Sequence, residues 1–343
     1  MATKIVVVGA SAGGVEALTE LVAGLPADLQ AAVFIVLHIP PYQGSQLAAV
    51  LSRVSRLPVL DAEDGAPIRA GTIRVGVADM HLVLEPDCMR LTRGPREGRV
   101  RPSVDVLFRS AAASFGTAVV GAVLSGSLDD GTAGLWAIRE RGGLALVQHP
   151  DTAMHRSMPQ SAIEHVDIDH VVPMHAMAGV VSDLVARAQP PPPEAPAPER
   201  LRIETLIAEA GNGLQAGVMD IGKVSKYTCP DCHGVLVQIE EGRIVRFRCH
   251  TGHGFSLQTL LIEVDRAIDD GLWDTVRAVE ERIMLLKQAA DIADGGGNAS
   301  TATRLRRSAE ETERRLEPLR EVALDPAFFG GSTTIEAVQE ADG

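Results

Sequence analysis

The sequence predicts an α/β first domain, with a mostly parallel sheet and helices on both faces, followed by a small Cys/His module and a helical hairpin. Three observations predict this order: apolar runs alternate with amphipathic stretches, a proline-rich segment follows, and three cysteines cluster beyond it. The predicted segments are 1–188 for the first domain, 189–200 for a proline-rich linker, 201–258 for the Cys/His module, 259–324 for the hairpin and 325–343 for a disordered tail.

Four apolar runs in the first domain predict strands buried on both faces, as in a parallel sheet covered by helices. They lie at residues 4–8, 32–37, 117–124 and 144–148. Helical spacing occurs at residues 13–25, 44–56 and 134–141. Short β-type runs between residues 58 and 91 predict a small antiparallel excursion from the parallel sheet.

Composition and charge exclude several classes of protein. The 343 residues are enough for two domains, and the net charge of −13 argues against a nucleic-acid partner, since phosphate binding needs clustered positive charge. No apolar run approaches the roughly 18 residues of a membrane helix, and the opening apolar run is too short for a signal peptide. We therefore expect a cytoplasmic protein without membrane insertion.

A serine follows the first apolar run, in the glycine-rich turn GASAGG. Such a turn often binds phosphate at a helix N-terminus, although this one lacks the dinucleotide spacing and a Walker lysine. The serine can also be only an N-cap. The pattern G-x-S-x-G equally fits a nucleophile elbow, where small neighbours leave the hydroxyl of Ser11 exposed.

A histidine and two aspartates follow two further apolar runs, at the sheet edge where ligands of open α/β sheets gather. His38 is either a strand-end cap or a general base, and His149 is its closest rival by position. Asp129 and Asp130 are either solvated turn formers or the source of a carboxylate that orients imidazole. Serine, histidine and aspartate at three strand ends together predict acyl transfer.

Residues 4 to about 182 resemble the catalytic domain of the bacterial chemotaxis protein-glutamate methylesterases. The matching signatures are IVVVGASAGGVEAL, VLHIPP, AEDG, HLVL, VRPSVDVLF, VLSGSLDDGTAGL and MPQSAI. The resemblance implies a doubly wound fold with a triad of Ser11, His38 and Asp130. It selects His38 over His149, and Asp130 over Asp129, because the family's aspartate directly precedes a glycine.

The resemblance also implies a reaction. Ser11 would attack the γ-methyl ester of a glutamate in a methylated chemoreceptor-like protein while His38 takes its proton. Methanol leaves, and water releases glutamate from the acyl-enzyme. Deamidation of certain glutamines would follow the same steps with ammonia as the leaving group. Catalysis needs no cofactor.

Backbone N–H groups near the nucleophile are expected to stabilise the oxyanion, as acyl transfer requires. The expected donors lie at Ala12 and in the loop with Ser127 and Leu128. Ala12 stands where relatives usually have threonine, and Ser127-Leu128 replaces a usual methionine–glycine pair, so we expect these donors to be shaped differently here. Arg101 is expected either to contact substrate or to fix its loop.

Family members of the chemotaxis type carry an N-terminal receiver domain with a phosphorylated aspartate. Met1 lies only a few residues before the first predicted strand, so we expect a receiver-less form that phosphorylation does not control in the usual way. One alternative is a catalytically idle sensory or scaffold module that binds a signalling partner through its C-terminal region. Another is an esterase for small molecules.

The cysteines beyond the linker have the spacing C-x2-C-x16-C-x3-H, typical of a closed structural zinc site. The four predicted ligands are Cys229, Cys232, Cys249 and His253, with His250 and His233 as competitors for the fourth place. Runs at 235–239 and 244–247 predict a hairpin that returns the second pair of ligands to the first. The competing interpretation is a redox Cys-x-x-Cys.

Two further features lie in the C-terminal half. Arg243, Arg246 and Arg248 are interpreted as a solvated or partner-facing strand, since they lie in an acidic half. Residues 259–286 and 303–324 predict two helices that fold back on each other, and Pro318 is expected to kink or end the second. Their charged surface is either simply solvated or a docking site for a helical receptor or signalling partner.

Overall fold

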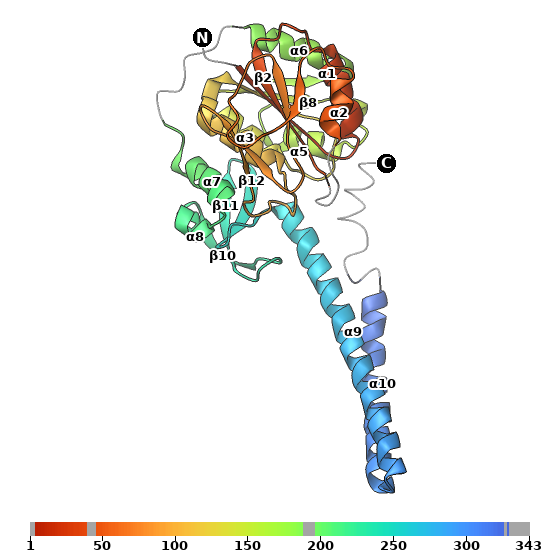
Figure 1. Ribbon diagram of the computed structural model, residues 1–343. Coiled ribbons are helices and arrows are strands. Elements are labelled where there is room, and N and C mark those ends of the chain that lie inside the picture. Colours follow the sequence, from red (N-terminus) through yellow and green to blue (C-terminus); the bar gives the residue numbers. More distant parts are fainter. Residues whose placement is uncertain (1–3, 40–45, 188–195, 326–327, 329–343) are drawn as a thin grey trace. The chain divides into compact units, whose positions relative to one another are not determined.

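The computed structural model describes residues 4–39, 46–187, 196–325 and 328 of the 343 (Figure 1). Residues 189–195 of the predicted linker, and residues 326–327 and 329–343 of the predicted tail, lie outside the described residues. The chain forms two compact units that divide after Leu260. Among the described residues, no helix combines the length and the apolar character that a bilayer span requires.

The first unit is built on a seven-stranded parallel sheet in the order β3-β4-β2-β1-β7-β8-β9. Its strands are β1 (Lys4–Ala10), β2 (Ala31–Leu37), β3 (Val59–Asp61), β4 (Thr72–Val75), β7 (Val119–Val123), β8 (Leu144–Gln148) and β9 (His170–Val172). The strand order reverses at β1, which lies between β2 and β7. The carboxyl ends of these three adjacent strands therefore meet at one edge, where ligands of such sheets bind.

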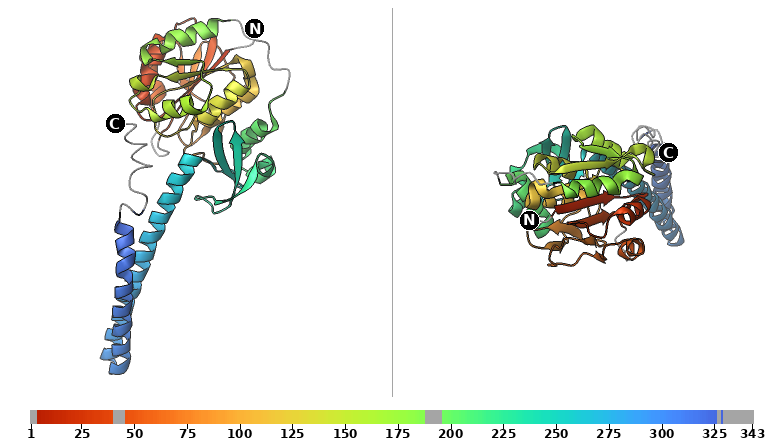
Figure 2. Two further views of the ribbon diagram at one scale, coloured as in Figure 1. Left: turned by 180° about the vertical axis from the view of Figure 1, so that it is seen from behind. Right: turned by 90° about the horizontal axis from the view of Figure 1, so that it is seen from above.

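Helices cover both faces of this sheet (Figure 2). One face carries α1 (Gly14–Gly24), α2 (Leu47–Ser52) and α6 (Met174–Ala186), and the other carries α3 (Val104–Phe115), α4 (Thr132–Glu140) and α5 (Ser157–His165). Successive residues of β1 enter the two cores alternately, because neighbouring side chains of a strand point to opposite faces. The doubly wound α/β fold expected from the sequence is confirmed.

The antiparallel excursion predicted between residues 58 and 91 is only partly present. β3 and β4 join the parallel sheet, and only β5 (His81–Leu84) and β6 (Met89–Thr92) form an antiparallel pair. The sequence of β4 suggested an antiparallel strand because buried and half-buried residues alternate along it. Ile73 and Val75 are buried, whereas Thr72 and Arg74 are half-buried. Such alternation is more typical of an antiparallel strand with one solvated face.

The Cys/His module follows within the same unit. It contains α7 (Glu199–Ala210), α8 (Gly213–Ala216) and the antiparallel strands β10 (Lys223–Thr228), β11 (Val235–Glu241), β12 (Ile244–Cys249) and β13 (Gly254–Ser256). Helix α7 begins inside the range predicted for the linker. The predicted hairpin is confirmed, because β11 and β12 pair in antiparallel register from Leu236–Cys249 to Glu241–Ile244. Within the described part of this unit, three short 3-10 helices also occur: Gly116–Ala118, Pro150–Thr152 and Val218–Asp220.

The second unit is a helical hairpin made by most of α9 (Leu257–Gly295) and by α10 (Ala299–Leu324). The Asn298 side chain caps α10 by accepting a hydrogen bond from the Thr301 N–H. Apolar residues along the seam hold the two helices together: Val276, Ile283, Ala309 and Leu316. Pro318 lies inside α10, which continues to Leu324, so of the two predicted effects, a kink or the end of the helix, the second is wrong.

Candidate functional site

Ser11 follows β1 directly and lies in the turn that leads into α1. Its N–H donates to the Ser125 carbonyl at 2.9 Å, and its own carbonyl accepts from the Gly14 N–H at 2.9 Å. Gly13 has φ of 66°, a conformation that is strained for residues with a Cβ. The glycine-rich sequence of the turn thus lets a strand pass into a helix while the serine is held on both sides by backbone hydrogen bonds.

A hydrogen-bonded relay joins the ends of the three central strands. Nδ1 of His38, which follows β2, lies 3.0 Å from Oγ of Ser11, and its Nε2 lies 2.7 Å from Oδ2 of Asp130, which follows β7. The carboxylate can only accept, so Nε2 carries the proton and Nδ1 is left to accept the hydroxyl proton of Ser11. The His38 and Asp130 side chains are 15% and 14% exposed, which shields the relay from bulk water.

Asp130 is held by the first turn of α3. Its carboxylate accepts hydrogen bonds from the Ser103 hydroxyl at 2.9 Å and from the N–H groups of Val104 and Asp105 at 2.7 and 3.0 Å. These N–H groups have no partner within the helix, and the helix dipole favours an anion at this position. Burial alone would raise the pKa of Asp130, but its hydrogen bonds to His38 and to the helix outweigh burial and lower it. The carboxylate therefore stays charged opposite His38.

The two rivals for the relay lie elsewhere. Nδ1 of His149 accepts from the Asp151 N–H at 3.2 Å, in a local turn after β8. Asp129 does not contact His38; burial raises its pKa to about 6, against a hydrogen bond from Ser256. The structure thus brings His38 and Asp130 to Ser11. Their rivals in the sequence, His149 and Asp129, are not part of the relay.

The expected oxyanion donors differ in their surroundings. The Ala12 N–H, next to Ser11, forms no hydrogen bond with the described residues. The Leu128 N–H donates to Oγ of Ser157 at 2.9 Å, and Leu128 itself has φ of 66°, where glycine is favoured. Ser127 lies in the same loop. Relative to the methionine–glycine pair usual in the resembled family, this loop therefore holds a bulky residue in a strained conformation.

Arg101 fixes its own loop. Its guanidinium contacts the Asp79 carboxylate at 2.6 and 3.0 Å and the Gly94 carbonyl at 2.8 Å. Arg101 was expected either to contact substrate or to fix its loop, and these contacts correspond to the second role.

A pocket of about 280 Å³ opens beside the relay. It is lined by His38, Ile39, Arg96, Arg99, Val100, Arg101 and Pro102. The arginines make one wall of this pocket strongly basic. The sequence reasoning missed Arg96 and Arg99, although the run RGPREGRVR shows the charge density from which they could have been chosen.

His81 is a second residue that the sequence reasoning passed over. Its ring is fully buried, its Nε2–H donates to the Pro95 carbonyl at 2.9 Å, and its Nδ1 accepts from the Ser103 N–H at 3.3 Å. Burial lowers its pKa to about 4, so the ring is neutral near pH 7. His81 thus connects the pocket loop to the residue that supports Asp130, and no spacing in the sequence indicates this link.

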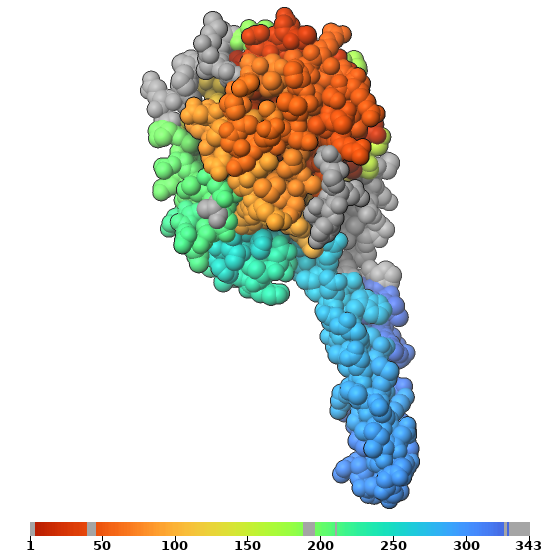
Figure 3. Space-filling view, in the orientation of Figure 1, coloured from red at the N-terminus to blue at the C-terminus, as the bar shows by residue number. Residues whose placement is uncertain are grey.

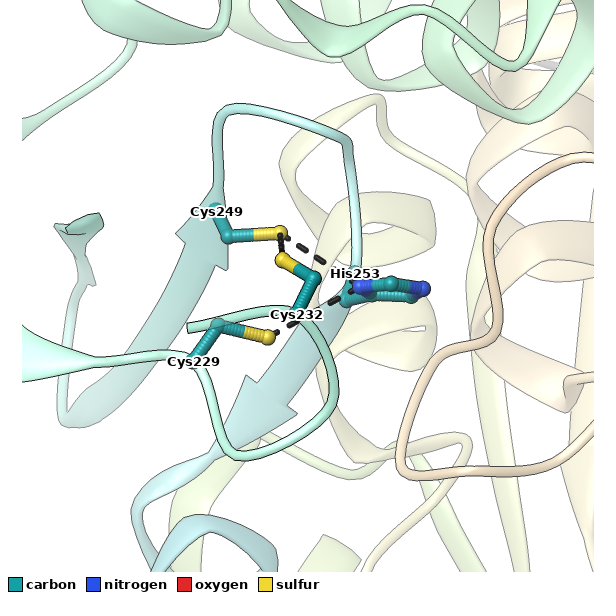
Figure 4. Close-up of side chains that lie close together, drawn as sticks. All are labelled: Cys229, Cys232, Cys249 and His253. Atoms are coloured by element: carbon teal, nitrogen blue, oxygen red, sulfur yellow. Dashed lines mark hydrogen bonds between the residues drawn. The ribbon is translucent and has the colours of Figure 1, made fainter. Parts of the chain in front are cut away.

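The Cys/His module brings four potential metal ligands together (Figure 4). The ligand atoms of Cys229, Cys232, Cys249 and His253 all lie within 4.8 Å of one another. Sγ of Cys232 lies 3.6 Å from Sγ of Cys249, which is far too long for a disulfide. Nδ1 of His253 lies 3.6 and 3.7 Å from two of the sulfurs. A tetrahedral zinc with ligands at about 2.3 Å requires an edge of about 3.8 Å, so this donor set fits the metal.

The fourth ligand position belongs to His253 in this arrangement. His250 and His233 are outside the group, although each is adjacent in sequence to a cysteine. The Thr251 hydroxyl lies 2.9 Å from Sγ of Cys249 and is positioned to donate to this sulfur. A hydrogen bond from the Cys229 thiol lowers the pKa of Cys249, which favours the thiolate that a metal binds.

The interpretation of Arg243, Arg246 and Arg248 as a solvated or partner-facing strand is wrong for two of the three. Arg246 and Arg248 are buried, and only Arg243 is exposed. Arg246 donates two hydrogen bonds to the Glu204 carboxylate at 2.7 and 2.8 Å, and Arg248 donates to Glu97 at 2.7 Å. Pairing of this quality offsets the cost of burying the charges.

Comparison with known proteins gives a consistent result for the first domain. A family model described as CheB methylesterase matches residues 6–181. A protein-glutamate methylesterase/protein-glutamine glutaminase of Nocardioides sp. is 39% identical over 191 residues, which cover 54% of this chain and 52% of that protein. A Leptospira interrogans protein is 34% identical over 174 residues, which cover 50% of this chain and 90% of that protein.

A solved structure shares the fold. The crystal structure of the Thermotoga maritima CheB methylesterase catalytic domain matches with a TM-score of 0.52 and 30% identity, covering 54% of this chain and 100% of that chain. Among the curated relatives named above, the chain spans about half the length of the Nocardioides protein and most of the length of the Leptospira protein.

Proposed function

Because the chain belongs to the CheB methylesterase family, we propose that its first domain hydrolyses glutamate γ-methyl esters of a methylated chemoreceptor-like protein in the cytoplasm. One observation carries the proposal: Oγ of Ser11 lies 3.0 Å from Nδ1 of His38, whose other nitrogen is bonded to Asp130, beside the basic pocket. This is the arrangement of nucleophile, base and orienting carboxylate that acyl transfer requires.

The reaction proceeds in two halves. Oγ of Ser11 attacks the ester carbonyl as Nδ1 of His38 takes its proton, and the imidazolium is stabilised by Asp130. The tetrahedral intermediate collapses, the C–O bond to the methoxy group breaks, and His38 returns the proton so that methanol leaves. A water molecule then gives a proton to Nδ1 and attacks the acyl-enzyme. The Ser11 ester breaks, Oγ recovers the proton, and the glutamate side chain is released.

Charge on the carbonyl oxygen needs donors during both attacks. We assign the Ala12 N–H to this role, because it adjoins Ser11 and forms no hydrogen bond with the described residues. The N-terminal end of α1 adds favourable electrostatic potential at the same place. A side-chain amide in place of the ester would give the same intermediate with ammonia as the leaving group, so deamidation of glutamine is part of the proposal.

The decisive experiment measures methanol release from methylated receptor preparations. Ser11→Ala and His38→Ala are expected to lower the rate by at least about 10³-fold without changing the circular dichroism spectrum. His149→Ala is the matched control, since this exposed histidine also follows a strand of the sheet. Release that persists in Ser11→Ala contradicts the mechanism. A wild-type protein that releases no methanol favours the idle scaffold, and turnover of simple esters alone favours a small-molecule esterase.

We also propose that Cys229, Cys232, Cys249 and His253 bind a structural zinc ion. The fit of their separations to a tetrahedron supports this, as does the mixture of thiolates and imidazole. Metal analysis of the full-length protein is expected to give about one zinc per chain. Cys229→Ser should abolish this content, whereas Cys88→Ser, which changes a cysteine outside the group, should keep it. Equal zinc in both variants would contradict the proposal.

A further inference from the structure

Five charged side chains, all largely buried, connect the Cys/His module to the first domain. Arg248 donates to Glu97 of the first domain at 2.7 Å and to Glu204 of α7 at 3.0 Å. Arg109 of α3 also pairs with Glu97 and lies 3.9 Å from Glu204, which in turn accepts from Arg246. Arg248 is 1% exposed and is therefore enclosed at this boundary. Figure 3 shows the module, green to teal, directly against the orange residues of the first domain.

Backbone and apolar contacts follow the same boundary. The Gly98 N–H donates to the Gly254 carbonyl at 2.7 Å, and the Gly254 N–H donates to the Arg96 carbonyl at 3.2 Å. The Thr92 hydroxyl donates to the Ala208 carbonyl of α7. Leu201 and Ile244 of the module belong to the apolar core on the α3 face of the sheet. The pocket loop, residues 93–101, is thus bonded to β13 along part of its length.

The groups that hold the pocket loop adjoin the metal ligands. Arg248 directly precedes Cys249, and Gly254 directly follows His253. The second Nη of Arg248 donates to the Gly252 carbonyl at 2.8 Å, inside the turn between these two ligands. A metal ion bound by Cys249 and His253 would fix both ends of this turn, and with them the two contacts on the loop.

The same loop forms the pocket wall. Glu97 lies between Arg96 and Arg99, both of which line the pocket beside His38. The groups that hold the relay directly lie outside this loop, because Asp130 accepts from the first turn of α3 and Ser11 is held by the turn after β1. The loop reaches Asp130 indirectly, through His81 and Ser103. Release of the loop from the module should therefore alter substrate binding more than proton transfer.

We propose that Arg248 is a positioning residue for the substrate pocket, held in place by the metal-bound turn of the Cys/His module. The contacts of the module with Glu97, and the backbone hydrogen bonds between the pocket loop and Gly254, hold the basic wall of the pocket in place. A receptor segment would bind against this wall. The metal state of a module outside the catalytic fold then sets the affinity of the pocket. This inference rests on the proposed esterase function for its kinetic consequence, but not for its structural one.

The kinetic test compares Arg248→Met with Arg243→Met, which changes an exposed arginine in the turn directly before the same strand. With methylated receptor as substrate, Arg248→Met is expected to raise KM between about tenfold and about 10²-fold while kcat stays within about twofold. Arg243→Met should leave both constants unchanged. An unchanged KM in Arg248→Met overturns the proposal, and so does a loss confined to kcat, since that would place the effect on the relay.

Hydrogen exchange tests the structural part without reference to activity. Removal of the metal from wild-type protein with a chelator, or the Arg248→Met change, is expected to speed exchange of the Gly98 amide at least about tenfold. The Asp105 amide, bonded to the Asp130 carboxylate, should stay protected. Equal acceleration at both sites, or none at Gly98, overturns the proposal. A wild-type protein without esterase activity would refute the proposed function alone and leave this structural test unaffected. If Arg248→Met does not fold, the exchange of the Gly98 amide is measured on chelated wild-type protein instead.

Discussion

Replacement of His81 by glutamine is expected to remove an acid-sensitive component of the stability of the first domain. Both ring nitrogens are satisfied only in the neutral form, with Nε2–H on the Pro95 carbonyl and Nδ1 accepting from Ser103. Protonation would place a second N–H against the Ser103 N–H, in a site with no exposed surface. For this reason burial lowers the pKa of His81 from its ordinary value of 6.5 to about 4.

Proton linkage gives the sign and size of the contribution of His81 to the free energy of unfolding at each pH. Because the pKa of His81 is lower in the folded state, the unfolded chain binds the proton first as the pH falls. The contribution of the neutral ring is therefore fully present above pH 6.5 and is lost as the pH falls from 6.5 towards about 4. The interval between these values corresponds to about 3 kcal/mol, of which about 2 kcal/mol is lost by about pH 5.

Urea unfolding of wild type and His81→Gln at about pH 8 and about pH 5 measures this difference. Burial raises the pKa of Asp105 to about 8 and that of Asp129 to about 6, so both aspartates also titrate within the span of the two measurements. Both are present in wild type and variant, so their effects cancel in the comparison. Between the two conditions, wild type should lose about 2 kcal/mol more than the variant.

Two controls sharpen the measurement. A Trp273→Phe background leaves Trp136 of α4 as the reporter of the first unit, since Trp273 lies on α9 in the hairpin. His149→Gln, at an exposed histidine, should keep the wild-type pH dependence. If wild type and His81→Gln lose equal stability between the two conditions, the assignment of a neutral buried ring is wrong.

Three further variants test the relay, its packing and the independence of the hairpin. Asp130→Asn should lower kcat by about 10⁴-fold and Asp129→Asn far less, as followed by methanol release; similar losses would contradict the assignment. Gly126→Ala places a Cβ in overlap with Sδ of Met158 and 2.8 Å from Cβ of Ser11 and should lower kcat by about 10²-fold, so a normal kcat would refute close packing behind the nucleophile. Leu316→Ala should destabilise the hairpin by about 2–5 kcal/mol in calorimetry while methanol release is unchanged.

The sheet and the relay could be predicted because their signals are local. Each central strand is an unbroken apolar run, and Ser11 and His38 stand at the first polar position after β1 and β2. The resemblance drawn from the signature motifs is confirmed by the family match. It also selected Asp130, which spacing alone could not separate from Asp129. The catalytic roles of these residues stay predictions until the variants are measured.

The contacts of the Cys/His module could not be predicted, because their partners are distant in sequence. Arg246 pairs with Glu204 across 42 residues, and Arg248 pairs with Glu97 across 151. Local composition cannot distinguish a solvated arginine from a paired one. The buried His81 was missed for a related reason, since its role depends on a carbonyl and an N–H that only the folded loop brings to its ring.

The assignment of Nδ1 of His38 to Ser11 and of Nε2 to Asp130 has a consequence for chemical labelling. Nε2 is engaged by Asp130, so in the proposed mechanism the nitrogen that faces an incoming ester is Nδ1, the one nearer the main chain. A substrate-like chloromethyl ketone would therefore alkylate Nδ1, and the adduct is a positional isomer that NMR of the isotope-labelled ring distinguishes from the Nε2 product. Covalent probes for this protein should accordingly approach the imidazole from its backbone side.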